Sequence, residues 1–127
     1  MFMLRYREHP CERYVRGRDW ENWNCWEFYM CMKRTKYMGM LCQEYVLCML
    51  KLNGYVIKDY DVWGFDILAT DGEYDYYIEV KCGRGAELTR TQRRTRNDVM
   101  RIPNARYVVC RFDEYGNLIE EELCSVS

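Results

Sequence analysis

The sequence lacks any apolar stretch that approaches the length needed to cross a membrane. Its apolar start covers only residues 1–4 and is interrupted by Arg5 and Arg7, so it is too short for the apolar region of a signal peptide. A linker, an internal repeat and a low-complexity run are absent too. The 127 residues, 49% of them hydrophobic, therefore predict one soluble domain that lies in the cytoplasm and does not contact a membrane.

The eight cysteines include no C-x-x-C pair, so the strong sequence signature of a zinc site is absent. Without a secretory signal we expect reduced, mostly buried thiols. Disulfides would be expected only in a hyperthermophile or one of its viruses. A zinc-stabilised interaction protein is an alternative, although the spacing of its ligands matches no established zinc pattern; they would be His9, Cys11, Cys25 and Cys31.

The net charge of −1 argues against a generally basic protein that coats nucleic acid, but the charges are unevenly distributed. Residues 59–79 hold seven acidic side chains and no basic one, and residues 81–111 hold nine basic and two acidic ones. An acidic block followed by a basic block suits a metal site beside a surface that binds phosphates. The alternative is that the two blocks are solvated faces that pair with each other.

Hydrophobic periodicity and turn residues predict the order helix, three strands, helix, strand. Apolar residues at spacings of three and four predict the first helix over residues 36–53, which Asn53 and Gly54 end. Alternation, the turn at Asp71-Gly72 and a capping box at Thr89 predict the other elements: strands over 55–60, 65–70, 74–82 and 105–112, a helix over 89–101, and an edge strand over 118–123.

This order predicts an α/β fold in which helices flank a mixed central sheet, with the core over residues 36–123. Residues 1–35 form an N-terminal extension, where Asp19 is expected to cap a helix. That helix would carry Trp20, Trp23, Trp26 and Met30. It could pack on the core, form a dimer contact or cover a substrate.

Three charged residues lie on neighbouring predicted strands. Glu79 and Lys81 are two positions apart, so their side chains project from the same face. The Asp71-Gly72 turn makes the strand of Asp66 an antiparallel neighbour of that strand. Two carboxylates and a lysine in one small volume suit a hard cation such as Mg²⁺, which prefers carboxylate oxygens and retains positions for water and phosphate. The alternatives are an exposed Asp66 and a surface ion pair between Glu79 and Lys81.

With Asp66 followed by Glu79-Val80-Lys81, the sequence resembles the PD-(D/E)xK nuclease superfamily, and within it the archaeal Holliday-junction-resolvase-like branch. The resemblance runs from about Gly39 to Phe112. It implies a restriction-endonuclease-like αβββαβ core and a metal-dependent DNA endonuclease. The sequence departs from the motif at Phe65, which stands where the superfamily often has proline.

The resemblance also implies roles for individual residues. Asp66 and Glu79 would bind Mg²⁺ or Mn²⁺, with the backbone carbonyl of Val80 as a further ligand. Glu44 on the first helix would complete the metal site, or it is only a boundary residue of the apolar stripe. Lys81 would be catalytic. Gln92 would position water or phosphate, or it serves only in the capping box.

A group of arginines follows the motif and is expected to contact the phosphate backbone of DNA; it consists of Arg84, Arg90, Arg93, Arg94 and Arg96. The resemblance favours branched DNA as substrate. Cutting a junction needs two active sites, which predicts a homodimer. The alternative function is a catalytically silent module that binds nucleic acid or takes part in assembly.

Overall fold

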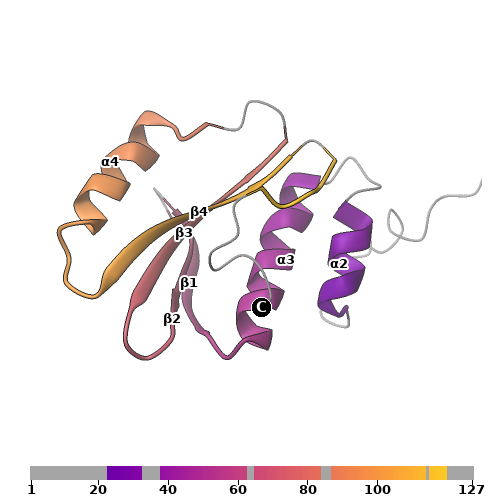
Figure 1. Cartoon of the computed structure of the whole chain (residues 1–127), viewed down its shortest axis with the longest axis horizontal. Coiled ribbons are helices and arrows are strands. Elements are labelled where there is room, and N and C mark those ends of the chain that lie inside the picture. Colours follow the sequence, from indigo (N-terminus) through magenta and orange to yellow (C-terminus); the bar gives the residue numbers. More distant parts are fainter. Residues whose placement is uncertain (1–22, 33–37, 63–64, 84–86, 114, 120–127) are drawn as a thin grey trace, which may run out of the picture.

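The computed structural model describes residues 23–32, 38–62, 65–83, 87–113 and 115–119. The order of the elements is as predicted. Their bounds are α2 (Cys25–Met32), α3 (Met38–Leu52), β1 (Val56–Val62), β2 (Phe65–Thr70), β3 (Asp75–Cys82), α4 (Arg90–Val99) and β4 (Ala105–Phe112). These elements form an α/β fold with a four-stranded mixed sheet flanked by helices (Figure 1).

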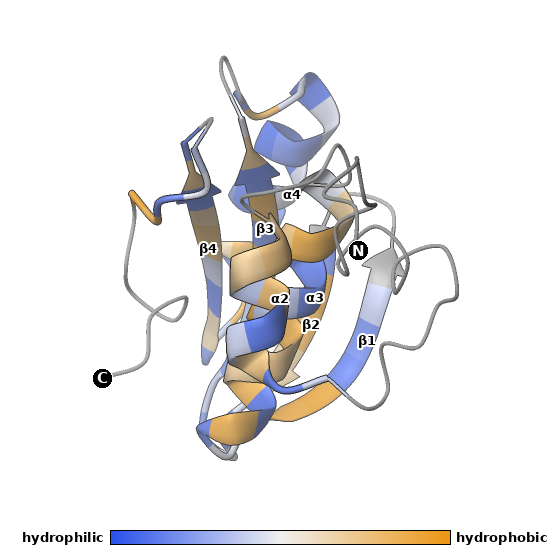
Figure 2. Cartoon of the chain, turned by 90° about the vertical axis from the view of Figure 1, so that its right-hand side faces the viewer, coloured by the Kyte–Doolittle hydropathy of each residue, from blue (hydrophilic) through white to orange (hydrophobic). Residues whose placement is uncertain are grey.

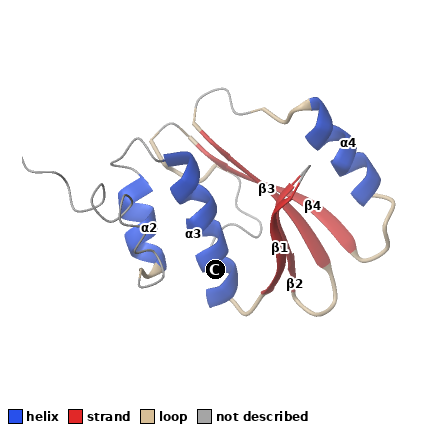
Figure 3. Cartoon of the chain, turned by 180° about the vertical axis from the view of Figure 1, so that it is seen from behind, coloured by secondary structure: helices blue, strands red, loops and turns tan. Residues whose placement is uncertain are grey.

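The sheet has the strand order β1-β2-β3-β4. Pairing is antiparallel from β1 to β2 and from β2 to β3, and parallel from β3 to β4. A parallel pair needs a crossover connection, and α4 supplies it. Helix α4 therefore lies on one face of the sheet, while α2 and α3 lie on the other (Figures 1 and 3).

The core lies between the sheet and α3. The helix buries one apolar stripe, and Ile67, Ile78 and Phe112 of the strands pack against it. The chain leaves α3 through Gly54, whose φ of +86° favours glycine. The amide of Tyr55 donates to the Leu50 carbonyl, which satisfies one of the last carbonyls of the helix. The predicted helix end at Asn53-Gly54 is confirmed.

Helix α2 differs from the expected N-terminal helix in where it begins. Its start at Cys25 is capped by Asn24, because the Asn24 side chain accepts from the Glu27 amide at 2.9 Å and the Glu27 side chain accepts from the Asn24 amide at 3.0 Å. The expected cap Asp19 lies outside the described residues, as does Trp20. Trp26 is 64% exposed and faces solvent.

Two further expectations concern the chain ends and membranes. The expected edge strand over 118–123 is represented by a single bridge between Leu118 and Phe112, and residues 120–127 lie outside the described part. No helix in the described ranges is long and apolar enough to span a membrane.

The structure contains disulfides, so the expectation of reduced thiols is wrong. One links Cys25 to Cys48 and joins α2 to α3; another links Cys42 to Cys82 and joins α3 to β3. Cys31 is disulfide-bonded as well, and no described cysteine is free. Cys25 and Cys31 therefore have no thiolate to offer zinc, while His9 and Cys11 lie outside the described residues.

Reduction of the disulfides should destabilise the protein. The Cys42–Cys82 bridge spans 40 residues of sequence. In the chain-entropy model a loop of that length contributes about 4 kcal/mol by restricting the unfolded chain. We expect dithiothreitol to lower the urea midpoint, and the double variant Cys42→Ala/Cys82→Ala to reproduce part of that loss without reductant, since the other disulfides remain. An unchanged midpoint in both cases would show that the bridge does not form in solution.

Candidate active site

Strand pairing places Asp66, Glu79 and Lys81 on the same face of the sheet. Ile67 and Ile78 are fully buried on the side covered by α3. Successive side chains alternate between faces, so the three charged residues project toward α4. The predicted convergence of these residues on neighbouring antiparallel strands is confirmed.

The strands β2 and β3 separate at this point. Their register begins at Thr70 opposite Asp75 and ends at Ile67 opposite Ile78. Beyond that pair, the amide of Val80 donates to Oδ2 of Asp66 at 2.7 Å. An aspartate side chain thus replaces a strand carbonyl as the acceptor, and it lies where the sheet opens.

Glu79 is the only buried charged residue among those described, with 3% of its surface exposed. Oε1 of Glu79 accepts from Nε2 of Gln92 at 2.5 Å and lies 3.6 Å from Nζ of Lys81. The Lys81 side chain is itself only 16% exposed. The interpretation of Glu79 and Lys81 as a surface ion pair is therefore wrong, because the pair is largely removed from water.

Gln92 serves in the predicted capping box and also contacts Glu79. Its amide donates to Oγ1 of Thr89 at 3.2 Å, and its Oε1 accepts from the Thr89 amide at 2.8 Å, which completes the predicted capping box. Its Nε2 remains for Glu79. The start of α4 and the contact to the buried carboxyl thus depend on the same side chain.

Burial, the negative charge of Asp66 and a hydrogen bond with it raise the pKa of Glu79 to about 8, against the lowering effect of Lys81. The site consequently holds a proton near neutral pH between two carboxyl groups. A carboxyl with such a pKa in a polar cluster is typical of functional sites.

The donor set suits one hard cation. Asp66 and Glu79 offer carboxylate oxygens, and Val80, the residue after Glu79, would add its backbone carbonyl. Mg²⁺ characteristically binds through one or two carboxylates plus water and phosphate. The described residues contain no group of three or more His, Cys, Asp or Glu side chains arranged for a metal ion. Glu44 lies half-buried on α3 and does not join the two carboxylates in such a group.

The arginines after the motif point in different directions. Arg96 lies on the inner side of α4 and acts electrostatically on Tyr107 of β4. Arg90 and Arg94 are exposed. Arg93 donates to the carbonyl of Leu88 at 2.6 Å and is also exposed. Most of α4 is hydrophilic, which fits a solvent-facing basic surface (Figure 2). Arg84 lies outside the described residues.

Two residues of β4 were missed by sequence reasoning. Arg111 is paired in register with Lys81 on the adjacent parallel strand, so both project to the face of α4. Tyr107 lies on that face as well, where burial and the negative charges of Glu79 and Asp66 raise its pKa. The signal that could have revealed them is the alternation of β4, where Val108, Cys110 and Phe112 are buried on the α3 side.

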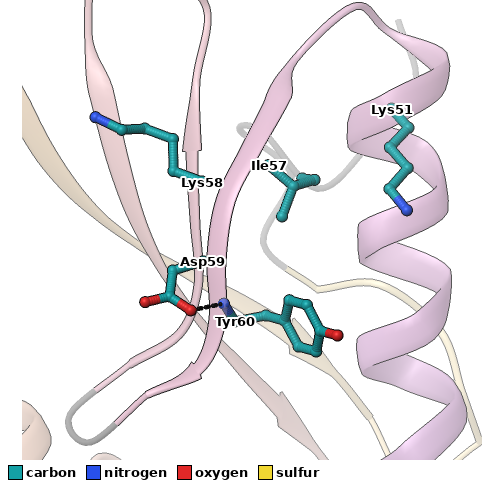
Figure 4. Close-up of a pocket in the computed structure, with 5 residues that line it drawn as sticks. All are labelled: Lys51, Ile57, Lys58, Asp59 and Tyr60. Atoms are coloured by element: carbon teal, nitrogen blue, oxygen red, sulfur yellow. Dashed lines mark hydrogen bonds between the residues drawn. The ribbon is translucent and has the colours of Figure 1, made fainter.

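A pocket of about 400 Å³ lies away from these residues, along the edge strand β1. Ile57 and Tyr60 lie on the side of β1 that faces α3, the helix that carries Lys51 (Figure 4). Lys58 and Asp59 project to the other side of β1 (Figure 4). None of the residues predicted for the functional site lines this pocket.

The comparisons with known proteins identify no relative. No family model matches the chain, and no curated protein or solved structure matches it either.

The raised pKa of Glu79 predicts how stability changes with pH in the presence of EDTA. Between the ordinary pKa of 4.5 and the folded value of about 8, the folded protein binds more protons than the unfolded chain. The free energy of unfolding should therefore fall as the pH rises through this range. The loss is a few kcal/mol at most, since each pKa unit corresponds to about 1.4 kcal/mol.

Urea unfolding at pH 5.5 and pH 8 measures this slope. Glu79→Gln should flatten it, because the amide keeps the shape of the side chain and does not titrate. Glu73→Gln changes an exposed glutamate of the β2–β3 turn and should keep the wild-type slope. Identical slopes in all three proteins would contradict a raised Glu79 pKa.

Proposed function

We propose that the chain is a divalent-metal-dependent nuclease that hydrolyses phosphodiester bonds in DNA, built on a restriction-endonuclease-like core of the PD-(D/E)xK type. The observation that carries this proposal is the buried Glu79 carboxyl beside Asp66, at the point where β2 and β3 separate. A buried carboxyl that repels its neighbour costs stability, and a bound cation would remove that cost. The donor set suits Mg²⁺ or Mn²⁺.

Each residue has a role in the proposed reaction. Asp66 and Glu79, with the Val80 carbonyl, would hold the cation. When bound, the cation lowers the pKa of a water molecule and stabilises charge on the scissile phosphate. Lys81, a compact point charge next to Glu79, would orient the attacking water or neutralise charge that develops on the phosphate. Gln92 would be released from Glu79 and turn its amide toward water or phosphate.

The substrate follows from the charge around the site. Arg90 and Arg94 are exposed on α4, whose first turn contacts the carboxyl pair through Gln92. Both lie two positions from Gln92 and therefore on the solvent side of the helix that covers the site. Exposed arginines on such a helix favour a nucleic-acid backbone, and such contacts set affinity more than sequence preference. Branched DNA is the substrate that the resolvase-like sequence pattern favours. A homodimer would then supply the two active sites that a junction requires.

A catalytically silent nucleic-acid-binding or assembly module is the second candidate. Two observations favour it. Gln92 and Lys81 already contact Glu79, so the carboxyl has partners in the absence of a cation. The described residues also hold no cluster of three potential metal ligands. In this case the same fold would bind nucleic acid without cutting it.

Cleavage of labelled DNA distinguishes the two candidates. A four-way junction, a duplex and a single strand are each incubated with Mg²⁺, with Mn²⁺ and with EDTA. We expect metal-dependent cutting that Asp66→Asn and Lys81→Ala reduce by about 10²- to 10³-fold, the usual effect of removing one group that stabilises a transition state. Asp66→Asn retains an oxygen that can accept from the Val80 amide.

Asp59→Asn is the matched control, since Asp59 is an exposed aspartate on β1 whose Oδ1 accepts from a backbone amide. It should cut at the wild-type rate. If the wild-type protein binds the probes and cuts none of them with either metal, the silent module is the better account. If Asp66→Asn cuts normally, the assigned site is wrong.

The exposed arginines of α4 should govern DNA affinity. The double variant Arg90→Gln/Arg94→Gln removes two exposed cations and leaves the capping box of α4 in place. We expect weaker binding for every sequence and a salt dependence reduced by about two phosphate contacts, measured by fluorescence anisotropy at several salt concentrations. Lys58→Gln on β1 is the control. Unchanged affinity in the arginine variant would place the DNA surface elsewhere.

A further inference from the structure

The end of β3 that carries Lys81 has a strand neighbour on one side only. Pairing with β2 stops at Ile78, while pairing with β4 continues to Cys82. On the side that β2 leaves open, the Asp66 carboxylate accepts from the Val80 amide at 2.7 Å. Sheet pairing beyond this bond therefore holds the backbone of Lys81 from β4 alone.

A disulfide supplies a second attachment for this segment. Cys82, the residue after Lys81, is bonded to Cys42 of α3. Successive residues of a strand face opposite sides of the sheet, so Cys82 projects toward α3 and Lys81 toward Glu79. Cys42 is fully buried on a helix that packs against the sheet. The bond therefore ties the backbone next to Lys81 to the core.

The charge of Lys81 depends on this backbone for its position. Nζ of Lys81 lies 3.6 Å from Oε1 of Glu79. A lysine side chain is a flexible stem with a point charge and lacks the rigid fork of arginine. Directly after the bridge, the chain turns at Gly83, whose φ is +96° and whose amide donates to the Phe112 carbonyl at 3.1 Å. A shift of this strand end would move the ammonium group relative to the carboxyl pair.

We propose that the Cys42–Cys82 disulfide positions Lys81 for catalysis, and that a dithiol which reduces this bond lowers the activity of the folded protein. This inference rests on the proposed nuclease function. It also goes beyond the effect of the bridge on stability. A disulfide that only restricts the unfolded chain would leave the turnover of the folded protein unchanged.

The reduction is a thiol–disulfide exchange. Cys82 is partly exposed and Cys42 is fully buried, so a thiolate of the dithiol attacks Sγ of Cys82. The S–S bond breaks, and the Cys42 sulfur leaves as a thiolate and takes up a proton. The second thiol of the reductant then displaces the Cys82 sulfur, which takes up a proton as well. The protein gains two thiols, and the dithiol is oxidised to its own disulfide.

Steady-state cleavage by the oxidised protein, without reductant, tests the positioning role. Cys42→Ser/Cys82→Ser should lower kcat by about 10- to 100-fold, because a misplacement of about 1 Å in a catalytic site can cost this much. KM should stay within about threefold, since the exposed arginines of α4 are retained. The matched control is Cys25→Ser/Cys48→Ser, which removes the disulfide between α2 and α3 and should keep the wild-type kcat.

Lys81→Ala provides a readout that a merely structural role would not move. In this background, loss of the Cys42–Cys82 bridge should cause no further fall in kcat, because both changes act through the same side chain. If the bridge supported the fold alone, its removal would lower kcat by the same factor with and without Lys81, and the inference would be overturned.

Titration of the wild-type protein with dithiothreitol gives a measurement that does not require the double variant to fold. Alkylation of Cys82, followed by mass analysis, reports the reduced fraction, and circular dichroism reports the fold. We expect kcat to fall as Cys82 becomes reduced while the circular dichroism signal stays constant, and reoxidation to restore kcat. Activity that is lost only together with the signal would contradict the positioning role.

Equal kcat in the wild-type protein and Cys42→Ser/Cys82→Ser would overturn the inference and leave the proposed function intact. An equal loss in Cys25→Ser/Cys48→Ser would overturn it too, since the effect would not belong to the bridge beside Lys81. An oxidised wild-type protein that cuts no probe with either metal would overturn both the inference and the proposed function.

Discussion

The separation of β2 from β3 beyond Ile67 and Ile78 is the constraint on which the candidate site depends. In a continuous ladder the Val80 amide would face a strand carbonyl, and the two carboxylates would be directly opposed side chains. Where the strands part, the Asp66 carboxylate takes the Val80 amide at 2.7 Å and fixes the position of its own strand relative to β3. Two like charges directly opposite each other in a sheet are unfavourable. The separation of β2 from β3 therefore accommodates the carboxyl groups of Asp66 and Glu79.

A buried carboxyl must be compensated, and α4 provides part of this compensation. Gln92 belongs to the capping box with Thr89 and also donates to Glu79, so the geometry of the helix start determines the geometry of the site. The crossover helix α4 therefore supplies a side chain to the candidate site in addition to connecting β3 to β4. On the other face, the Cys42–Cys82 disulfide ties the residue after Lys81 to α3. The end of β3 is held from both sides of the sheet.

The features predicted correctly from the sequence are those that depend on residues close together in the chain. The strands Phe65–Thr70 and Ala105–Phe112 have the predicted bounds, and the capping box of Thr89 forms as expected. What the sequence did not reveal depends on distant pairing. The disulfides join cysteines 23 and 40 residues apart. The place of Arg111 beside Lys81 requires the parallel register of β4, which no residue spacing encodes.

The contacts of Glu79 bear on whether the site binds a cation or only resembles one that does. A purely structural hydrogen bond to the Gln92 amide needs an acceptor, which a neutral side-chain amide at position 79 would also provide. A glutamate there adds burial of an ionisable group and repulsion from Asp66, both of which raise its pKa to about 8. Lys81 offsets that cost only in part. A cation bound in place of the proton would be attracted by both carboxylates. The two charges that repel each other would then contribute to cation binding, and this favours the nuclease over the silent module.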